Sequence, residues 1–374
     1  MQLTREQINY CMECGVCTGS CPISYELPSF SPRQIIKRTS AGQDEDFLKS
    51  REIWACLNCA RCSSRCPVEI DFPEFIRSYR EKARKNGNLP VESHHGILQS
   101  IAGLQTSNIK QQRTAWAKEA GDFQETGDYF YFVGCLPYFE VTFGYLNLSP
   151  LSSAKSVLSL LNKMGVTPVI SNDECCCGHD ALWSGDKATF LALAEKNLEA
   201  IKSSGAKTVL FSCPEGYYTF KHHYPKYFKD IPFEVLHITE FLTQKMPEAE
   251  LSFKPSSNGT LTYQDPCRLG RLSGNYDLPR QLLNSLPETN LLEMQRSKEN
   301  ALCCGTSAWM ECSGCSKAMQ VDRLQEAIQT GAQTLITACP KCQIHLTCAQ
   351  RNTDLNLKVT DLYTYISERL NGAE

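Results

Sequence analysis

Short apolar segments rich in β-branched and aromatic residues alternate with amphipathic segments along much of the chain. Two of these apolar segments, Thr208–Phe211 and Thr334–Thr337, each follow a segment with the spacing of an amphipathic helix. Strands that alternate with helices in this way are typical of α/β units with parallel strands. We therefore expect α/β domains from about residue 128 to the end of the sequence.

The first 90 residues have a different pattern, which favours short helices. Ser31-Pro32 is typical of a helix N-cap followed by proline in the first helical position. Asp71 followed by Glu74 resembles a capping box and predicts a helix that ends near Gly87. The predicted fold is α+β overall, with a helical domain at residues 1–90 followed by a helical connector at residues 91–127.

The α/β part contains an internal repeat. Asn197–Pro214 and Arg323–Pro340 share Leu, Gly-Ala, Thr and Cys-Pro at an offset of 126 residues. A Cys-Cys-Gly sequence occurs in each copy, at residues 176–178 and 303–305. A repeat of this length predicts two duplicated domains, which we place at residues 128–255 and 256–374.

Each copy has the order strand, Cys loop, helix, strand, Cys-Cys-Gly loop, helix, strand, Cys-Pro loop. Parallel strands bring the loops that follow them to one edge of the sheet. Three cysteine-bearing loops in each copy are therefore expected to converge on one metal site.

Eight cysteines near the start form two matching runs, each with the spacing C-x2-C-x2-C-x3-C-P. This spacing is typical of two-cluster ferredoxins, where the fourth cysteine of each run ligates the other [4Fe–4S] cluster. The first predicted cubane cluster has the ligands Cys11, Cys14, Cys17 and Cys66. The second has the ligands Cys56, Cys59, Cys62 and Cys21.

Two other uses of these cysteines fit the sequence less well. A disulfide framework needs an oxidising compartment and usually a small domain, whereas this chain has 374 residues and begins with a polar segment without an apolar core. Structural zinc would use four local cysteines, and two matched runs that end in proline favour clusters.

The two repeats offer different numbers of thiolates. The second copy contains five cysteines, Cys267, Cys303, Cys304, Cys339 and Cys342. Five ligands suit a distorted cluster or a bridging thiolate, and the alternative is zinc with a spare cysteine. The first copy contains four matching cysteines, Cys135, Cys176, Cys177 and Cys213. Gly216 stands where the second copy has Cys342, so the first copy is expected to hold a cubane cluster or zinc.

These residues together resemble a known family. Two C…CCG…CPxC copies behind a double ferredoxin run are similar to heterodisulfide reductases in which a ferredoxin-like subunit and a CCG-domain subunit are fused. The resemblance implies a noncubane [4Fe–4S] cluster on the five cysteines of the second copy. The chain is also similar to the CCG-domain electron-transfer subunit of class II benzoyl-CoA reductase complexes, and related chains sit beside flavin subunits in electron-bifurcating assemblies.

Three functions follow from the resemblance. The first is an iron–sulfur electron-transfer subunit of a cytoplasmic multi-subunit oxidoreductase in anaerobic metabolism, with a flavin-containing partner. The second is a catalytic disulfide reductase, although that family is thought to need two noncubane clusters and the first copy lacks its fifth cysteine. The third is the iron–sulfur subunit of a flavin-dependent hydroxy-acid or glycerol-3-phosphate dehydrogenase. The absence of a P-loop or G-x-G-x-x-G motif favours a subunit over a self-sufficient enzyme.

Composition narrows the partners further. The formal net charge of -3 provides no basic footprint for nucleic acid. The longest apolar stretch, Tyr129–Phe139, is interrupted by Gly134 and Pro137, so no membrane span is expected. The 21 cysteines without an export signal indicate reduced thiols in the cytoplasm.

Several polar and sulfur-bearing residues stay without an assigned role, and no catalytic residue is predicted. His179 is either a substitute ligand or a structural residue, and the extra Cys175 precedes the first Cys-Cys-Gly pair. Cys312, Cys315 and Cys348 are either a further site or free thiols. His222-His223 and the tyrosines around them either line a channel or form an amphipathic surface segment.

Overall fold

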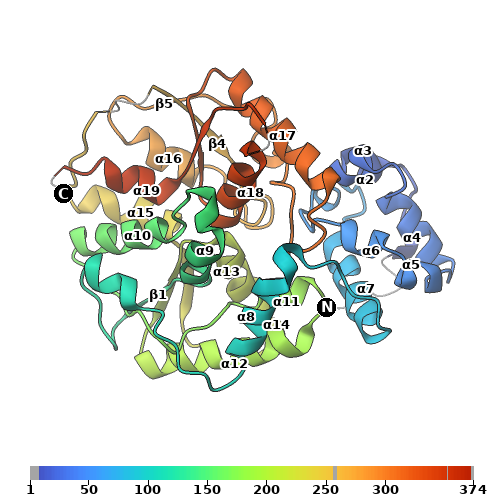
Figure 1. The fold of residues 1–374 in the computed structure, drawn as a ribbon, viewed down its shortest axis with the longest axis horizontal. Helices are drawn as coiled ribbons and strands as arrows, with labels where there is room; N and C mark the ends of the chain where they lie inside the picture. The colour runs from blue at the N-terminus through green and yellow to red at the C-terminus, as the bar shows by residue number, and fades with distance from the viewer. Residues whose placement is uncertain (1–7, 256–258, 352, 372–374) are drawn as a thin grey trace.

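The computed structural model describes residues 8–255, 259–351 and 353–371. Figure 1 shows the N-terminal helices, in blue, as a lobe beside a larger body that contains both sheets. The α-helices of this lobe are α2 (Val16–Ser20), α3 (Pro22–Glu26), α4 (Pro32–Ser40), α5 (Glu45–Lys49), α6 (Glu52–Ala55) and α7 (Phe72–Lys85).

Helices α4 and α7 begin where the sequence predicts. The Ser31 side chain accepts a hydrogen bond from the amide three residues further on and caps α4. The Asp71 side chain accepts from the Glu74 amide and caps α7. The Glu74 carboxylate pairs with Arg77 at 2.7 Å, so Asp71 supplies the cap and Glu74 joins a partly buried ion pair.

The connector contains one α-helix within the described residues, α8 (Ile97–Gln105), between the 3₁₀ turns η2 (Ser93–Gly96) and η3 (Ala115–Glu119). This agrees with the expectation of one or two connecting helices.

The first repeat is built on a parallel sheet with the strand order β1-β2-β3 among the described residues. Its elements are β1 (Tyr129–Phe132), α9 (Leu136–Phe143), α10 (Leu151–Lys163), α11 (His179–Trp183), α12 (Lys187–Ser204), β2 (Thr208–Phe211), α13 (Pro214–Tyr218), α14 (Tyr224–Tyr227), β3 (Glu234–His237) and α15 (Ile238–Lys245). The expected strand before the Cys-Cys-Gly loop is reduced to Val169. Val169 extends the sheet beside β1, because its amide donates to the Tyr129 carbonyl at 2.7 Å and its carbonyl accepts from the Tyr131 amide at 2.9 Å.

The second repeat has a parallel sheet of strand order β5-β4-β6-β7 among the described residues. Its elements are β4 (Thr260–Gln264), α16 (Leu278–Asn284), β5 (Asn290–Leu291), α17 (Gly314–Gln329), β6 (Thr334–Thr337), α18 (Pro340–Gln350), β7 (Lys358–Asp361) and α19 (Leu362–Glu368). Strand β5 lies beside β4 as Val169 lies beside β1, so the two repeats share one topology. The final strand and helix of each repeat were not in the predicted order of elements.

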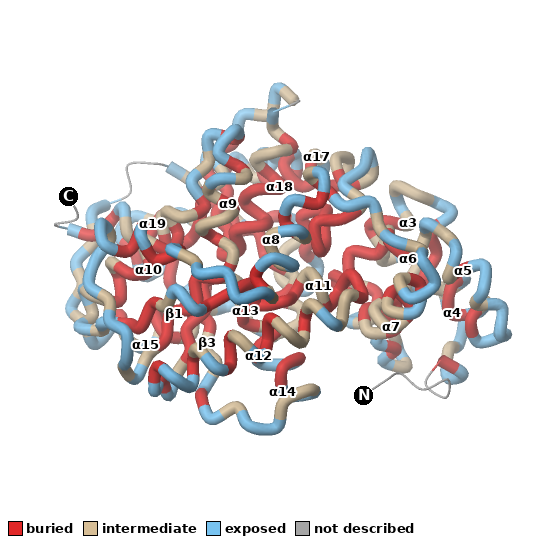
Figure 2. The backbone as a smooth tube through the Cα atoms, turned by 60° about the horizontal axis from the view of Figure 1, so that its bottom comes forward, coloured by how far each residue is buried: buried red, intermediate tan, exposed pale blue. Residues whose placement is uncertain are grey.

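The two repeats share a hydrophobic core. Tyr131 and Leu210 of the first sheet belong to the same buried cluster as Tyr263 and Ile336 of the second sheet. Figure 2 shows buried backbone running through the middle of the larger body. The loops at the ends of both sets of strands are therefore held in one fixed framework.

Candidate iron–sulfur sites

The N-terminal lobe brings the two cysteine runs together in a crossed arrangement. One cavity of about 450 Å³, open to solvent, is lined by the first three cysteines of the first run and the last of the second, Cys11, Cys14, Cys17 and Cys66. A second cavity, of about 320 Å³, is lined by the first three cysteines of the second run and the last of the first, Cys56, Cys59, Cys62 and Cys21. Cys62 also borders the first cavity, so the two spaces are neighbours.

The two ferredoxin-type sites differ in burial. Cys14 is exposed, whereas Cys56, Cys59 and Cys62 are each only 8% exposed. Burial raises the pKa of Cys21 to about 11 and that of Cys56 to about 12. Four such sulfurs around one cavity fit an iron–sulfur cluster, because iron provides the positive charge that stabilises buried thiolates.

The loops of the second repeat gather its five cysteines at the carboxyl end of the sheet. Gly305 has φ +88° and Pro340 is the first residue of α18, so both loops turn sharply beside the thiols. The sulfurs of Cys267, Cys303, Cys304, Cys342 and Cys339 form a chain of hydrogen-bonding neighbours in that order.

The electrostatics of this second site also fit a metal cluster. The hydrogen bonds with Cys304 and Cys339, together with burial, raise the pKa of Cys342 well above its usual range. The hydrogen bonds from Cys303 and Cys342 lower the pKa of Cys304 to about 6 although burial opposes this. A site that favours one thiolate among protonated thiols can bind iron by releasing the remaining protons.

The first repeat brings a smaller thiol group together. Cys176 hydrogen-bonds with Cys135 and Cys177. Cys213 lies close enough to Cys177 for its charge to raise the pKa of Cys177. Gly216 occupies the position that Cys342 has in the second repeat. A Cβ atom at Gly216 would lie 4.0 Å from the Cys177 Cβ and 3.1 Å from the Phe211 ring. This position therefore borders the site but provides no sulfur.

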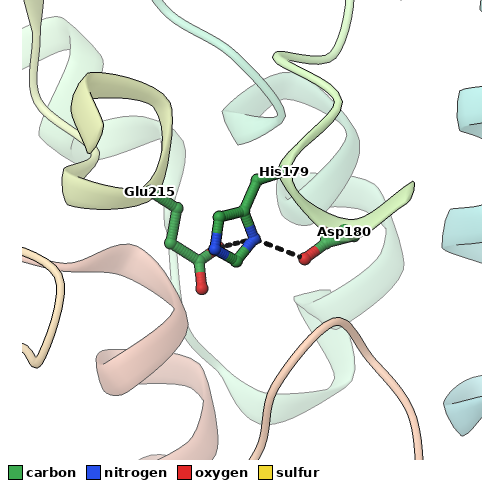
Figure 3. Close-up of side chains that lie close together, drawn as sticks. All are labelled: His179, Asp180 and Glu215. Atoms are coloured by element: carbon green, nitrogen blue, oxygen red, sulfur yellow. Dashed lines mark hydrogen bonds and ion pairs between the residues drawn. The ribbon is translucent and has the colours of Figure 1, made fainter. Parts of the chain in front are cut away.

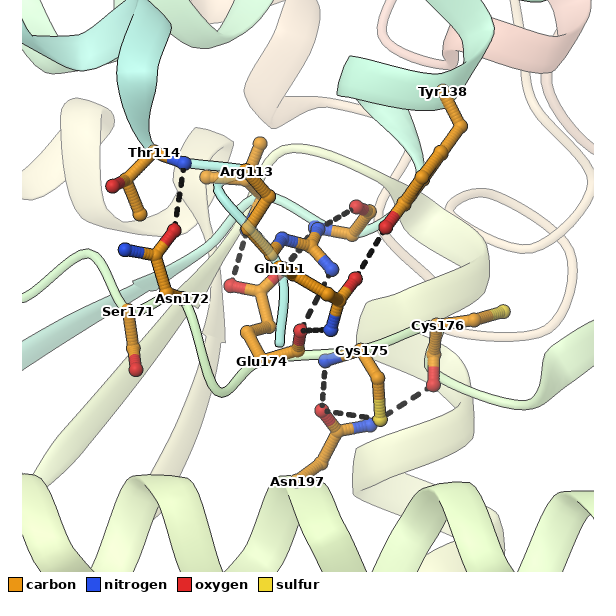
Figure 4. Close-up of polar contacts among 12 residues, drawn as sticks. Gln111, Arg113, Thr114, Tyr138, Ser171, Asn172, Glu174, Cys175, Cys176 and Asn197 are labelled. Atoms are coloured by element: carbon orange, nitrogen blue, oxygen red, sulfur yellow. Dashed lines mark hydrogen bonds and ion pairs between the residues drawn. The ribbon is translucent and has the colours of Figure 1, made fainter. Parts of the chain in front are cut away.

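Cys175 lies beside the first site but is turned away from it (Figure 4). Its sulfur lies 3.4 Å from both the Leu193 carbonyl and the Asn197 Oδ1, on helix α12. The Asn197 amide donates to the Cys176 carbonyl at 2.9 Å, so one side chain holds the loop on both sides of Cys175. The Cys175 sulfur is therefore directed toward α12 and away from the other thiols of the first repeat.

The connector holds the cysteine loop of the first repeat in place. Arg113 donates to the Glu174 carbonyl at 2.8 Å and pairs with the Glu174 carboxylate at 2.9 Å. That carboxylate also accepts from the amides of Val133, at 3.1 Å, and Gly134, at 2.6 Å. Figure 4 shows Arg113 beside Glu174. The Glu174 carboxylate thus joins two loops that both lead to cysteines.

A buried charged cluster lies between the two repeats (Figure 3). The Lys341 amine, with a side chain 5% exposed, pairs with Asp180 at 2.5 Å and with Glu215 at 2.6 Å. His179 Nδ1 lies 3.0 Å from Asp180, and His179 Nε2 accepts from the Arg268 Nε at 3.1 Å. The three acidic and imidazole groups are close enough together for a metal ion, but the Lys341 ammonium already pairs with both carboxylates. His179 thus belongs to this charged cluster and hydrogen-bonds with Asp180 and Arg268.

Sequence reasoning missed this charged cluster. Glu215 and Lys341 occupy equivalent positions, because Cys213-Pro214-Glu215 matches Cys339-Pro340-Lys341 in the repeat. Opposite charges at matching positions were the available signal, since a pseudo-symmetric interface brings equivalent residues together.

The four cysteine groups form a series of neighbours. The thiols of Cys59 and Cys303 lie within electrostatic range of each other, and so do those of Cys213 and Cys339. Arg271 of the second repeat donates to the Cys59 carbonyl at 2.9 Å, and Arg268 donates to the Asn58 carbonyl. The second ferredoxin-type loop is thus fastened directly to the Cys267 loop.

The remaining cysteines and histidines lie in different surroundings. Cys312 and Cys348 line one pocket, whereas Cys315 lines another, so this C-x2-C pair does not converge. The His223 ring is buried and lies edge-on to Trp183, whereas His222 is exposed and its ring lies tilted against that of Tyr218. None of these aromatic residues borders a cavity named above.

Comparison with known proteins agrees with this geometry. A 4Fe-4S dicluster domain model matches residues 7–70, and a cysteine-rich CCG domain model matches residues 129–221 and 261–347. These matches define the class: an iron–sulfur protein that joins a dicluster ferredoxin domain to two CCG domains. The boundaries of the predicted domains extend beyond the matched residues and stay predictions.

The chain belongs to the heterodisulfide reductase-like iron–sulfur proteins. A subunit of the dihydromethanophenazine:CoB–CoM heterodisulfide reductase of Methanosarcina barkeri is 28% identical over 97% of this chain and 94% of its own length. The probable iron–sulfur-binding oxidoreductase FadF of Bacillus subtilis is 29% identical over 71% of this chain and 39% of its own length. The EtfAB:quinone oxidoreductase of Syntrophomonas wolfei is 28% identical over 63% of this chain and 35% of its own length.

A solved structure supports the fold alone. A hypothetical protein from Helicobacter pylori aligns with a TM-score of 0.58 and 12% identity, over 99% of this chain and 75% of that one. Within the described part of the chain, no helix has the length and apolar character that crossing a membrane requires.

Proposed function

We propose that this chain is an iron–sulfur electron-transfer subunit of an oxidoreductase complex. The observation that carries the proposal is the unbroken series of cysteine groups, from the exposed Cys14 to the buried junction between the repeats. Electrons enter or leave at the exposed ferredoxin-type site and pass through the second one to the CCG domains. The protein spaces the clusters and adjusts their potentials by burial and hydrogen bonds.

The ligand sets of our proposal keep the crossed assignment in the N-terminal lobe. Cys66 completes the first cubane cluster and Cys21 the second, which the two cavities support. The five cysteines around Cys304 would hold a noncubane [4Fe–4S] cluster. The four cysteines around Cys176 would hold a cubane cluster or zinc.

The complex that we propose includes a flavin-containing partner in the cytoplasm. The chain's own motifs offer no hydride-transferring cofactor, so an electron pair from an organic donor must be split elsewhere. The relative named EtfAB:quinone oxidoreductase supports an electron-transferring partner of this kind.

A specific observation favours disulfide reduction as the second candidate function. A pocket that opens to solvent reaches Cys135, Cys176 and Asp180 at the first CCG site. The M. barkeri relative carries heterodisulfide reductase in its name. The absence of a sulfur at Gly216 weighs against this candidate, because the first site has four matching cysteines where the second has five.

Anaerobic purification with metal analysis tests the electron-transfer proposal. We expect about twelve irons and one zinc per chain, or about sixteen irons without zinc, since each cluster contains four irons. Two clusters should be reducible by a low-potential donor and detectable by EPR. A chain that turned over a physiological donor and a disulfide by itself, as a monomer, would contradict the subunit role and support the second candidate.

The crossed ligation has its own matched test. Cys66→Ser should remove the EPR signal of the exposed cluster, and Cys21→Ser that of the buried one. The exposed cluster is identified as the one whose EPR relaxation is accelerated more by a water-soluble paramagnetic probe. The reverse pairing of variants and lost signals would show that each run closes its own cluster.

A further inference from the structure

Arg80 of α7 is a fully buried cation beside the second ferredoxin-type site. The residue is 0% exposed, and its guanidinium donates five hydrogen bonds, all to uncharged oxygens. The acceptors include the Cys56 carbonyl at 2.7 Å, Asn58 Oδ1 at 2.6 Å and, in the first CCG domain, the Trp183 carbonyl at 3.0 Å. These contacts hold the loop that contains Cys56, but none of them balances the charge of Arg80.

The charge of Arg80 has no carboxylate partner within the described part of the chain. Glu311 acts on it from a distance, but that carboxylate pairs with Arg51 and accepts from the Val91 amide at 2.9 Å. Burial lowers the pKa of Arg80 to about 10, and the charge of Cys56 is the strongest effect that opposes the fall. Since buried charges are normally paired or coordinate metals, Arg80 requires a counter-charge, and thiolates bound to iron provide one.

A second buried arginine reaches the same loop from the second repeat. Arg268 is 3% exposed and donates to the Asn58 carbonyl and, at 3.1 Å, to His179 Nε2. The thiol of Cys267 lies within electrostatic range of its guanidinium. Arg268 therefore lies between the second ferredoxin-type site and the second CCG site.

Asn58 is the residue at which the two guanidiniums meet. Its side-chain oxygen accepts from Arg80 and its carbonyl from Arg268, and its backbone has the uncommon φ of +51°. In this conformation the Asn58 amide donates to the Cys56 sulfur at 3.4 Å. Hydrogen bonds to ligand sulfurs affect the potential of a cluster, so the two arginines act both by their charge and by positioning this amide.

A third cation of this loop, Arg61, lies between Cys59 and Cys62 in the sequence. It is half-buried, and it donates no hydrogen bond within the described residues. Burial and the neighbouring arginines lower the pKa of Arg61 to about 10, whereas the charge of Cys59 opposes the fall. Replacing this side chain therefore removes a charge but no hydrogen bond.

The first ferredoxin-type site has a different charge distribution. Glu13 and Arg33 border its cavity with one charge of each sign, and Glu13 pairs with the exposed Lys37 at 2.9 Å. Cys14 is exposed, so water and salt screen these charges. Neither of the two charged residues that border this cavity is fully buried.

We propose that Arg80, with Arg268 and Arg61, sets the potential of the second ferredoxin-type cluster, so that an electron in the N-terminal lobe rests there and not at the first cluster. This inference rests on the electron-transfer function proposed above. Reduction transfers one electron to the cluster from a partner or an added reductant, and no bond forms or breaks. It adds one negative charge to the cluster and its four thiolates, which the buried cations stabilise.

Two effects of burial oppose each other at this site. Desolvation disfavours the added negative charge and by itself lowers the potential of a buried cluster. A fixed cation in a buried position favours the same charge, and salt screens it weakly. Because these three arginines pair with no carboxylate among the described residues, their charges remain available to the cluster, and the second effect is the larger one.

The test is a redox titration of the anaerobically purified, iron-loaded protein, followed by EPR. We expect the buried second cluster to be reduced at a higher potential than the exposed first cluster. Arg80→Met should lower the reduction equilibrium constant of the second cluster on the order of tenfold, which is about 59 mV for one electron, and leave the first cluster unchanged. An unchanged second potential, or an equal shift of both, would overturn the proposal.

Arg80→Lys separates the charge from the hydrogen bonds. Lysine retains the charge but cannot donate five hydrogen bonds, so this variant should be less stable than the natural chain and still keep most of the potential. A potential as low as that of Arg80→Met would assign the effect to the geometry of the loop and contradict the role of the charge.

Arg61→Gln keeps the proposal testable if Arg80→Met does not fold. It should lower the reduction equilibrium constant of the second cluster about two- to threefold, a smaller effect because Arg61 is partly exposed and therefore screened. No change in that constant would overturn the proposal by itself.

Arg84→Met is the matched control on the same helix. Arg84 lies one turn after Arg80 and donates to the Ser184 carbonyl at 3.4 Å, as Arg80 donates to the Trp183 carbonyl, but it makes no hydrogen bond to the Cys56 loop. Both potentials should stay unchanged in this variant. A loss equal to that of Arg80→Met would assign the effect to the contact with the first CCG domain and overturn the proposal.

The same measurements separate this inference from the proposed function. A protein without two cubane signals and the corresponding iron would refute the proposed function itself. Two intact signals whose potentials do not respond to the arginine variants would refute only the role of these residues.

Discussion

The two CCG domains have one topology but different sites. In the second, Cys342 on α18 adds a fifth sulfur to the group around Cys304. In the first, Gly216 leaves the same position without a side chain, and the nearby Cys175 is turned toward α12. This difference indicates that the duplicated fold fixes the positions at which ligands can lie. Single substitutions then decide how many sulfurs each site contains.

The repeats also differ in what surrounds their metal positions. The second site lies against the second ferredoxin-type loop through Arg268 and Arg271. The first site instead borders the cavity that opens to solvent. Under our proposal, the second domain exchanges electrons with the N-terminal lobe. The first domain faces the pocket that opens to solvent.

The largest expected effect comes from removing the fifth thiol. Cys342→Gly should make the second copy like the first and abolish any noncubane signature in Mössbauer and EPR spectra, because four thiolates remain. Gly216→Ala is the matched control in the other repeat, where a methyl group only presses on the Phe211 ring. An unchanged noncubane signature in Cys342→Gly would remove the proposed basis of the asymmetry.

The second effect is on the junction between the domains. Lys341→Met removes the ion-pair partner of the mostly buried Asp180 and Glu215 and should lower the free energy of unfolding by about 3 kcal/mol. The midpoint of anaerobic urea unfolding measures this loss. Lys85→Met is the control, since its side chain is exposed and pairs with Glu81 at 3.0 Å, so about 0–1 kcal/mol is expected.

The same junction predicts acid sensitivity. Burial tends to raise the pKa of Asp180, but Lys341 and His179 together hold it below its usual value. A depressed carboxyl pKa contributes stability that is complete above the unfolded-state pKa, about 3.9, and is lost as the pH falls toward the folded-state value. The acid-induced loss should therefore be smaller in Lys341→Met than in the natural chain.

A smaller effect is expected on the potential of the second CCG site. Burial lowers the pKa of His345 to about 3, so the ring is neutral, and its Nδ1 donates to Cys304 when that sulfur is a thiolate. Hydrogen bonds to ligand sulfurs raise a cluster's potential. His345→Phe should lower it on the order of 50 mV, the equivalent of about 1 kcal/mol for one electron.

Redox titration followed by EPR measures that change. The signals of the N-terminal clusters provide an internal control, because His345 lines neither of their cavities. A shift of all clusters together would indicate a general structural effect and contradict the local role.

The smallest effect is expected at Cys175. Cys175→Ser should keep the metal content of the first site and change stability by about 1 kcal/mol or less, because a hydroxyl also donates to Leu193. Iron and zinc analysis with thermal unfolding measures this. A loss of metal would make Cys175 the missing ligand and erase the asymmetry between the repeats.

The sequence by itself determined the spacing of the cysteine runs, the duplication, the parallel α/β units and the helix starts at Ser31 and Asp71. These features are local, since a cap, a turn or a strand depends on neighbouring residues and on the repeat of a pattern. The number of matching cysteines in each copy was also readable, because glycine stands at position 216 where the second copy has Cys342.

Only the tertiary structure decided which distant groups meet. Lys341 with Asp180 and Glu215, the orientation of Cys175, and the pairing of Lys317 with Cys348 all join loops and helices from separate parts of the chain. The strand expected before the first Cys-Cys-Gly loop became a single bridging residue, Val169, for the same reason. Side-chain direction and long-range contact come from the packing of both repeats into one core, which no local pattern encodes.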